Sequence, residues 1–546
     1  MNVNKWILFF LVLPSVVYST NIECVQPNAS VDLDINNIRA KLQNGGDLFW
    51  DPFAIIDSNL YSFEVPKGSG KHSSFSNAIW FSGIDQSNNL HVSAQTYRQF
   101  ANAYWPGPLD EMGSTTINEC QIWNKVFNVY GQEIIEHKRD RNENYNIYKW
   151  PGEYAPYFDL NSDGIYDPSV GDYPLISQSM TEVVPGQMAF WIFNDVGMQL
   201  NSELNKSFLR FEIHALAYAF QSDREVLNNT IFLKYKLINK SLNDYNNFKF
   251  SFFHDFDIGN HTDDYSGCDL STNTRGVKRN LAYVYNSDAI DGFYIKPNYG
   301  AAPPAIGLIT FESNKSSSMM FNNNIESIIV YDTECVACPD PISIDEYIRR
   351  LMNGRTSANL NFRYGTEKGI GTTGDITMFT FPGDTDPNGK PAWYETGTPM
   401  IQPYNLSTIG LSTFQPGEVR EVDYAVVWAR DTPGTNLSSL NKLRLSSDTV
   451  IDAYNAFFKD YVLNVKNEES VMYSIYPNPS SDFIWIKSNK REWNKKVSVQ
   501  IFDLNGKSMI NSKISFNEAI DVSLLKEGVY ILKLNDFTSK ILINRK

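Results

Sequence analysis

Hydrophobic and polar residues alternate in several long segments, with the period of two that a β-strand requires. The clearest of these segments are residues 211–220, 228–241, 248–259 and 417–430. Two further segments, 77–85 and 91–100, are predicted as a pair of strands that turn at Asn88-Asn89. Because successive side chains of a strand point to opposite faces, this alternation predicts strands that share a buried core.

One segment near residue 450 changes to the period of a helix. An apolar stripe with the spacing i, i+3, i+4, i+7 runs through Val450, Ala453, Tyr454 and Phe457. Ser447 or Asp448 is the expected N-cap, so we predict a helix that closes over the sandwich. A looser helical pattern lies in residues 121–141. The expected fold class is mainly β, a large β-sandwich core with few helices.

The first residues have the three parts of a secretory signal peptide. Lys5 supplies the positive start, an apolar run extends from Trp6 to Val17, and Val17 and Ser19 precede the expected cleavage point. A membrane-spanning helix needs roughly 18 or more apolar residues, and this run is shorter. We therefore predict a signal peptide at residues 1–19 and no transmembrane span in the mature chain.

Short alternating stretches separated by turn dipeptides fill the last residues, from about 472, and predict a second, small β-sandwich. The order of motifs at this end resembles the C-terminal sorting domain of type IX secretion substrates. The matching residues are Tyr476-Pro477-Asn478-Pro479, Asp503-Leu504-Asn505-Gly506-Lys507, Gly528-Val529-Tyr530 and Lys540-Ile541-Leu542-Ile543.

The resemblance implies an Ig-like sorting domain and export through the periplasm of a Gram-negative bacterium by the type IX secretion machinery. It also implies removal of this domain, followed by release or by attachment to surface lipopolysaccharide. We therefore expect a secreted or outer cell-surface protein. Its expected parts are the signal peptide, a β-rich region at 20–185, the sandwich core with its closing helix at 186–465, and a linker with the sorting domain at 466–546.

Several stretches within residues 32–460 resemble a group of large exported proteins from bacteria that use this secretion system. They include VPKGSGKHSSFSNAIWFSGID, NNTIFLKYKLINKS and YAVVWAR. The group has no assigned activity, so this resemblance implies an exported protein without implying a substrate.

Composition and charge narrow the set of partners. The net charge is −15, and an acidic surface repels phosphate backbones while it suits divalent cations. We therefore expect no nucleic-acid partner. The five cysteines do not make a disulfide scaffold in a chain of 546 residues. Cys335 and Cys338 are expected to form a loop disulfide or to stay as thiols, with half a zinc site as the alternative.

The sequence VPKGSGKHS at residues 65–73 contains the GSGK of a phosphate-binding loop without its other requirements. Val65 stands where the first Gly is needed, and His72 stands where a Ser or Thr hydroxyl binds magnesium. A glycine-rich turn between strands is predicted instead.

The stretch DLNSDGIYDPSVGDYP has the spacing of a calcium loop. Oxygen ligands fall at alternate positions, on Asp159, Asn161, Asp163, Ile165 (through its carbonyl) and Asp167. Gly164 permits the sharp turn, and Asp172 replaces the usual acid at the position of Val170. Since no helix precedes it, the loop resembles those of dockerin and thrombospondin type 3 repeats. Ca²⁺ is the expected cofactor, and an Asx-rich turn without an ion is the alternative.

A second acidic segment, HDFDIGNHTDDYSGCD, follows a predicted strand. Its candidate ligands for Ca²⁺ are Asp255, Asp257, Asp263 and Asp264. The histidines in the segment also permit zinc. Two carboxylates on one strand edge can serve as the acid and base of a glycosidase, so a secreted polysaccharide hydrolase is the alternative function.

The chain contains no G-x-S-x-G or H-E-x-x-H sequence, so an enzyme is the less favoured class. Aromatic residues make up 14% of the chain, which suits stacking on glycans. We therefore expect a calcium-stabilised, non-catalytic protein that binds extracellular glycan or protein in an adhesion role.

Overall fold

The structure is a computed structural model of the chain. It describes residues 24, 26–50, 62–95, 103–141, 143–177, 183–196, 208–292, 297–311, 325–332, 345–356, 358–366, 369–396, 403–458, 473–488, 496–503, 507–515, 518–534 and 537–545. The chain forms two compact units, residues 1–461 and 462–546. The predictions for the signal peptide, for Cys335 and Cys338 and for Gly506 lie outside the described residues.

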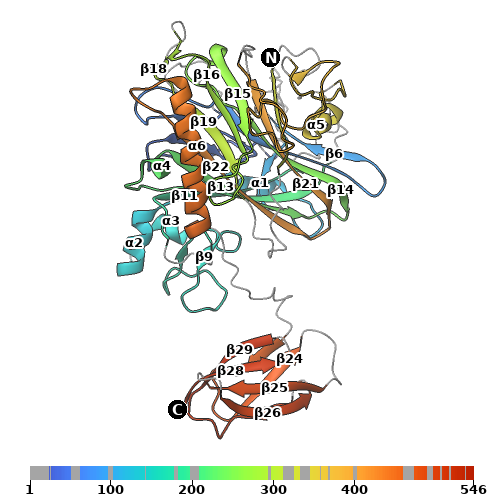
Figure 1. The fold of residues 1–546 in the computed structure, drawn as a ribbon. Helices are drawn as coiled ribbons and strands as arrows, with labels where there is room; N and C mark the ends of the chain where they lie inside the picture. The colour runs from blue at the N-terminus through green and yellow to red at the C-terminus, as the bar shows by residue number, and fades with distance from the viewer. Residues whose placement is uncertain are drawn as a thin grey trace, which may run out of the picture. The chain divides into compact units, whose positions relative to one another are not determined.

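Two nine-stranded antiparallel sheets build the larger unit (Figure 1). The first has the order β1 (Ser30–Leu33), β2 (Arg39–Gln43), β3 (Asp47–Leu48), β5 (Ser76–Ile84), β14 (Tyr245–Asp255), β21 (Pro403–Phe414) and β20 (Ile325–Asp332), with β4 (Phe63–Glu64) on β2 and β6 (Leu90–Ser93) on β5. The second has the order β15 (Asp264–Asp269), β16 (Leu281–Asn286), β19 (Ala305–Thr310), β22 (Val419–Ala429), β13 (Thr230–Asn239), β12 (Phe211–Ala219), β11 (Gln187–Asn194) and β7 (Trp105–Pro106), with β8 (Phe127–Tyr130) on β11. The segment expected as a β-rich region at 20–185 thus contributes strands to both sheets.

The main core lies between these sheets and follows the alternation of the sequence. It joins Phe81 and Phe250 of the first sheet to Trp191 and Tyr235 of the second. The face of β22 predicted to be buried lies entirely in this core, through Val422, Tyr424, Val426 and Trp428. Burying each such side chain contributes about 1.5–3 kcal/mol. The prediction of a mainly β sandwich with few helices is confirmed.

Helix α6 (Asn436–Ala453) covers the outer face of the second sheet, beside β16, β19 and β22 (Figure 1). The predicted closing helix therefore exists, but its predicted N-cap is wrong. Thr435 caps the helix, with its hydroxyl accepting from the backbone N–H of Ser438 at 3.2 Å. The helix begins earlier because Leu440 and Leu443 extend the apolar stripe of Val450 toward the N-terminus. A π-helical turn, Tyr454–Phe458, follows.

The other helices are short. The prediction of one helix within residues 121–141 is wrong, because α1 (Ile117–Ile122) and α2 (Gly131–Asp140) are separated by β8. Val129 belongs to strand β8, where it pairs with Met188 of β11. Its apolar side chain is therefore part of a strand and not of a helix. The remaining helices named in the described residues are α3 (Tyr145–Tyr148), α4 (Glu225–Asn228), the 3-10 turn η1 (His261–Asp263) and α5 (Asp345–Met352), which packs on the outer face of the first sheet.

Three local features answer questions that the sequence raised. Residues 65–70 form the predicted glycine-rich turn, in which the Gly70 N–H donates to Glu64 Oε1 at 2.6 Å. Cys24 and Cys120 form a disulfide, and Cys268 is a buried free thiol. Across the described ranges, no helix combines the length and the apolar character needed to cross a membrane.

Two small sheets build the second unit, as the alternation from residue 472 onward predicted. One has the order β23 (Tyr473–Tyr476), β24 (Phe483–Ser488) and β27 (Ala519–Asp521). The other has the order β26 (Ser508–Ser515), β25 (Lys496–Phe502), β28 (Gly528–Leu534) and β29 (Phe537–Ile543). Ile486 of the first sheet and Val499 and Leu532 of the second share one core, which makes the unit a β-sandwich.

Candidate functional site

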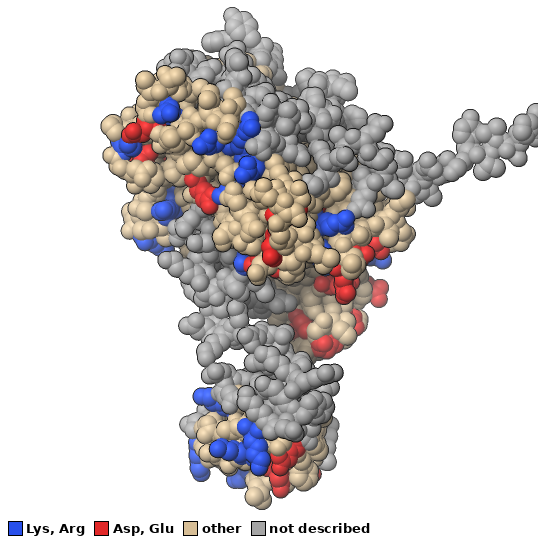
Figure 2. Space-filling view, turned by 90° about the vertical axis from the view of Figure 1, so that its right-hand side faces the viewer, with Lys and Arg blue, Asp and Glu red and all other residues tan. Residues whose placement is uncertain are grey.

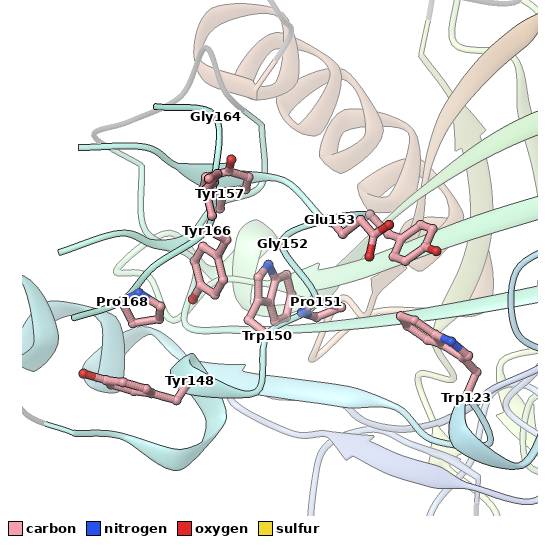
Figure 3. A pocket seen from close by; sticks show the side chains of 12 residues that line it. Trp123, Tyr148, Trp150, Pro151, Gly152, Glu153, Tyr157, Gly164, Tyr166 and Pro168 are labelled. Atoms are coloured by element: carbon pink, nitrogen blue, oxygen red, sulfur yellow. The ribbon is translucent and has the colours of Figure 1, made fainter. Parts of the chain in front are cut away.

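A pocket of about 520 Å³ lies in the segment between α1 and β10 (Tyr173–Pro174), outside the second sheet. We call it the aromatic pocket, because its lining includes Trp123, Tyr148, Trp150, Tyr154, Tyr157 and Tyr166. Trp123 and Tyr148 lie at opposite ends of the row of labelled side chains, with Trp150 between them (Figure 3). Its volume is within the range of small-molecule sites.

Short capped helices place the two ends of this row. Thr116 caps α1 by accepting from the Glu119 N–H at 3.1 Å, and Trp123 follows directly at the C-terminus of this helix. Asn144 caps α3 by accepting from the Asn146 N–H at 2.9 Å, and Tyr148 ends α3. The disulfide from Cys120 further fixes α1. Side-chain caps satisfy otherwise unpaired N–H groups, which is why such short helices persist here.

Hydrogen bonds and ring contacts hold the middle of the pocket. Trp150 is buried, and its Nε1 donates to the carbonyl of Pro156 at 3.1 Å, which folds the segment 150–156 back on itself. The hydroxyl of Tyr166 donates to the Ile147 carbonyl at 2.8 Å. Tyr157 and Tyr166 meet edge to face with ring centroids 5.1 Å apart. These rings are therefore held in place before any ligand arrives.

Apolar surface remains accessible around this rigid centre. Tyr148 is 40% exposed and Ile165 is 66% exposed, although both line the pocket. Trp123, Tyr154, Tyr157 and Tyr166 are partly buried. Exposed apolar side chains gathered around a hollow are typical of a binding site, because their burial by a ligand is favourable.

Burial raises the pKa of two tyrosines of the pocket, Tyr154 and Tyr157. Burial raises the pKa of Tyr154 to about 12, and the carboxylates of Glu153, Glu212 and Glu119 contribute in the same direction. Burial also raises the pKa of Tyr157, with the carboxylates of Asp159, Asp172 and Asp163 adding to it. The side chains of Tyr154 and Tyr157 therefore stay neutral at any physiological pH.

The predicted calcium loop, residues 159–172, forms one wall of this pocket through Gly164, Ile165, Tyr166 and Pro168. We call it the acidic loop. Asp159 accepts from the Asp163 N–H at 3.3 Å through Oδ1 and from the Gly164 N–H at 2.7 Å through Oδ2. Gly164 adopts φ +79°, which is the turn expected at this position.

The structure brings most of the loop's candidate ligands together. The amide of Asn161 donates to Asp163 Oδ2 at 2.9 Å. Asp172 is fully buried and accepts from the N–H groups of Leu160, at 2.9 Å, and Asp167, at 2.8 Å, so it closes the loop. Each carboxylate oxygen has two lone pairs, so these backbone bonds leave acceptor capacity for a cation. The set of hard oxygen donors fits Ca²⁺.

The second set of predicted ligands, Asp255, Asp257, Asp263 and Asp264, lies elsewhere, where β14 ends and β15 begins. We call it the acidic cluster. Asp255, Asp257 and Asp264 are buried, with 0%, 4% and 0% exposure. Asp264 Oδ2 accepts from the Ile258 N–H at 2.8 Å. Burial raises the pKa of Asp257 well above its usual value, and the neighbouring Asp255 and Asp264 carboxylates raise it further.

The pKa of Asp263, the fourth carboxyl of the acidic cluster, is also raised. Burial raises the pKa of Asp263 to about 6, and Asp291 on β17 (Ile290–Asp291) adds to the effect. The Oδ1 atoms of Asp257 and Asp264 are buried without a hydrogen-bond partner in the described part of the structure. Buried carboxyls in such proximity must be protonated or neutralised by a cation.

Neither acidic set has a pre-formed metal geometry by side chains alone. Within the residues that the structure describes, no group of three or more His, Cys, Asp or Glu side chains is arranged so that it could hold a metal ion. Coordination by the acidic loop would therefore draw on Asn161 and on backbone carbonyls such as that of Ile165, as the sequence pattern predicts.

In the predicted sorting signal, the side chain of Asn478 makes two hydrogen bonds to the backbone of β29. Asn478 donates through Nδ2 to the Lys540 carbonyl at 2.9 Å and accepts from the Leu542 N–H at 2.8 Å. Its neighbours Pro477 and Pro479 follow cis peptide bonds. Tyr530 donates to the Lys526 carbonyl at 2.9 Å. The motif thus joins the start of this sandwich to its last strand, β29.

Sequence reasoning found the acidic loop and missed the aromatic pocket beside it. The signal that points to the pocket is the run YNIYKWPGEYAPYF at 145–158, where aromatic residues are dense, prolines recur and no regular alternation exists. Aromatic residues outside a strand or helix pattern have no predicted core to enter. Such a run is therefore a candidate for exposed aromatic surface.

Charges of both signs are interspersed over the described part of the larger unit on the face drawn in Figure 2.

Comparison with known families identifies the C-terminal part of the chain. Residues 474–544 match the family described as secretion system C-terminal sorting domain. The sorting-domain prediction is therefore confirmed, and with it export to the cell surface or secretion. The resemblance of residues 32–460 to a group of exported proteins stays a prediction. A search of curated proteins finds no match to the chain.

Two solved structures show weak likeness to the chain. One is a polysaccharide lyase, with 10% identity and a TM-score of 0.18, which covers 61% of this chain and 34% of the lyase. The chain thus spans about a third of that protein's length. The other is the adhesin domain of Epf from Streptococcus pyogenes, with 8% identity, a TM-score of 0.11 and coverage of 60% and 89%. Neither similarity is strong enough to carry an argument.

Proposed function

We propose that this type IX secretion substrate, which its sorting domain directs to the cell surface or the medium, is a saccharide-binding protein that works through the aromatic pocket. The observation that carries the proposal is the row of aromatic rings around one hollow of about 520 Å³. The C–H faces of sugar rings pack against aromatic rings, while sugar hydroxyls bond the hydroxyl groups of Tyr side chains. The pocket offers both kinds of contact.

The binding site is held largely rigid without a ligand, which favours affinity. The Trp150 indole, the Tyr166 hydroxyl and the Tyr157–Tyr166 contact already have their partners within the protein. Binding therefore costs little conformational entropy at these side chains. A binding and adhesion role at the cell surface is consistent with such a site.

Ca²⁺ is proposed as a stabiliser of the acidic loop. The loop's side chains Asp159, Asn161 and Asp163 lie together, and its residues 164–168 form part of the pocket wall. A cation held there would fix that wall. Ca²⁺ at the acidic cluster is proposed on a separate ground, because three buried carboxyls otherwise have to carry protons.

A non-catalytic role is favoured over hydrolysis by the position of the carboxyls. A glycosidase needs two carboxyl groups on either side of the bond that it cleaves. The described lining of the aromatic pocket contains one, Glu153. The carboxyls of Asp255, Asp257 and Asp264 are buried and do not line this pocket, so a polymeric substrate would not reach them.

Calorimetric titration of the full chain with neutral, amine-bearing and acidic oligosaccharides tests the proposal. At least one class is expected to bind, and Trp123→Ala is expected to weaken that binding by roughly tenfold or more, a typical cost of removing an aromatic anchor. Tyr145→Ala is the matched control, because Tyr145 is 75% exposed on the neighbouring α3 and does not line the pocket. Absence of binding in every class, or equal effects of the two variants, would contradict the proposal.

A further inference from the structure

The aromatic pocket carries a charge of one sign. Glu153 is the charged residue among the described lining residues, and no Lys, Arg or His contributes to that lining. Glu153 is exposed, and no ion pair with it is found in the described part of the chain. In Figure 3 its carboxylate lies toward the Trp123 end of the pocket. A ligand would therefore meet one uncompensated negative charge beside aromatic rings.

More carboxylates surround the pocket than its lining alone shows. The Glu119 carboxylate accepts from Trp123 Nε1 at 3.1 Å, so it lies at the edge of that indole. At the other side, Asp159, Asp163 and Asp172 act electrostatically on Tyr157. A cation bound by the acidic loop offsets these three charges, so Glu153 and Glu119 are the carboxylates that act on a ligand at the Trp123 end of the pocket.

Nearby cations do not reverse this field. Lys125 Nζ lies 6.0 Å from the Trp123 ring centroid and 5.1 Å from that of Phe127, and it is not part of the pocket lining. Lys149 Nζ lies 5.9 Å from the ring centroid of Tyr145, which is outside the pocket. Lys240 lies 3.8 Å from the Glu212 carboxylate, so its charge is already paired.

We propose that the pocket selects saccharides that carry a free amine, with the protonated amino group held between Glu153 and the rings of Trp123 and Tyr154. This inference rests on the proposed function and adds the class of sugar. An ammonium group is attracted to the negative faces of aromatic rings, and a carboxylate beside them strengthens the attraction. Uronic acids and sulfated sugars are disfavoured, because no guanidinium or ammonium group of the lining can bind their anions.

The arrangement suits a sugar amine better than an isolated amine. A small cation needs only an aromatic cage, whereas this row extends from Trp123 past Trp150 to Tyr148 (Figure 3). Trp150 is buried within this row, so further rings of a saccharide can pack on the more exposed Tyr148 and Ile165 while one amino group stays near Glu153. The aromatic surface then contributes affinity for any saccharide, and Glu153 favours those that carry a positive charge.

A direct test compares two oligosaccharides with the same backbone. Calorimetric titration of the full chain with chitosan oligomers, which carry free amines, and with their fully N-acetylated, neutral counterparts isolates the amine. Chitosan oligomers are expected to bind roughly tenfold more tightly, as an exposed cation–π contact together with one ion pair would give. The preference is expected to weaken as salt rises, because the contact is at the surface.

Glu153→Gln is the decisive variant. It is expected to lower the preference for the amine from roughly tenfold to about two- to fivefold while binding of the neutral oligomer persists, since one surface ion pair is removed and the cation–π contact and the stacking surface stay. Glu143→Gln is the matched control, because Glu143 is an exposed carboxylate that precedes α3 in the chain and does not line the pocket. Circular dichroism and a thermal melt establish that each variant is folded.

The outcomes separate this inference from the proposed function. Equal affinity for both oligomers, tighter binding of oligogalacturonate, or an amine preference that Glu153→Gln leaves undiminished would overturn the inference. In those cases sensitivity to Trp123→Ala would still support saccharide binding in the pocket. Binding of none of the oligosaccharides would contradict both.

Discussion

Trp123 and Tyr154 meet edge to face, with ring centroids 5.1 Å apart and planes at 84°. Tyr154 in turn contacts the imidazole of His214 on β12, at 5.5 Å and 82°. His214 is buried, and its Nε2 lies 2.7 Å from Glu212 Oε1. The pocket wall is thus connected, through Tyr154, to strand β12 of the second sheet.

Tyr154→Ala is expected to weaken saccharide binding and to lower the free energy of unfolding by about 1–3 kcal/mol, because it removes both ring contacts. Tyr154→Phe keeps the ring and is expected to retain most of the stability. Thermal melts and calorimetric titrations on the two variants check this. If Tyr154→Ala bound saccharides as the wild type does, the ring would have no part in holding the site.

Asp159→Asn is expected to reduce the stabilisation that Ca²⁺ gives to the full chain. A ligand that binds only the folded state raises its stability by RT ln(1 + [L]/Kd), about 2.7 kcal/mol at a hundredfold excess over Kd. The measurement is a thermal melt in EDTA and then in excess Ca²⁺. Asp110→Asn is the control, since Asp110 accepts from the Met112 and Ser114 N–H groups in an Asx turn outside the acidic loop.

An unchanged calcium-induced shift in Asp159→Asn would place the responsible ion away from the acidic loop. No calcium-induced shift in the wild-type chain would remove the calcium proposal for both acidic sets.

Asp257→Asn is expected to stabilise the chain at pH 7 in EDTA. The folded-state pKa of Asp257 is raised by burial and by the Asp255 and Asp264 carboxylates, so the folded state holds a proton that the unfolded state has lost. The stability contribution of the protonated acid is therefore complete below the unfolded pKa of about 4 and is lost as the pH rises through the raised folded pKa. The Asn side chain in Asp257→Asn is neutral at every pH, so the variant does not lose this stability as the pH rises.

Melts between pH 4 and pH 8 in EDTA test this expectation, with the exposed Asp223→Asn as control. The decline with rising pH is expected to be shallower in Asp257→Asn than in the wild type and the control. Excess Ca²⁺ is expected to stabilise the variant less than the wild type, because the acidic loop still binds Ca²⁺ in both. A steeper decline in the variant would show that the carboxylate is charged and compensated in the folded state.

Asn478→Ala is expected to reduce export of the full chain. The substitution removes the two hydrogen bonds to the backbone of β29, each contributing about 0.5–1.5 kcal/mol. The fraction of the protein that reaches the cell surface or the medium is the quantity to measure. Asn511→Ala is the control, because Asn511 is exposed on β26 of the same unit. Equal export of the two variants would show that the tie to β29 is dispensable.

The positions of strands could be predicted because apolar and polar residues alternate along a strand that has one buried and one exposed face. Residues predicted at 77–85, 211–220, 228–241, 248–259 and 417–430 correspond to β5, β12, β13, β14 and β22. The helical stripe of α6 was equally visible, although its start at Asn436 was not, because the N-cap Thr435 lies in a segment where polar residues outnumber apolar ones. Around residue 129 the local pattern failed, since pairing with β11 decided the conformation.

The sequence by itself determined what depends on neighbours along the chain. It specified the alternating strands, the glycine-rich turn at 65–70, the spacing of oxygen ligands from Asp159 to Asp172, and the sorting motif around Asn478, because each of these is a short-range pattern of backbone and side-chain chemistry. The tertiary structure alone decided what depends on segments distant in sequence. It joined Cys24 to Cys120 and gathered Trp123 with Tyr166 around one hollow, because the packing of separate segments sets such distances and no local period encodes them.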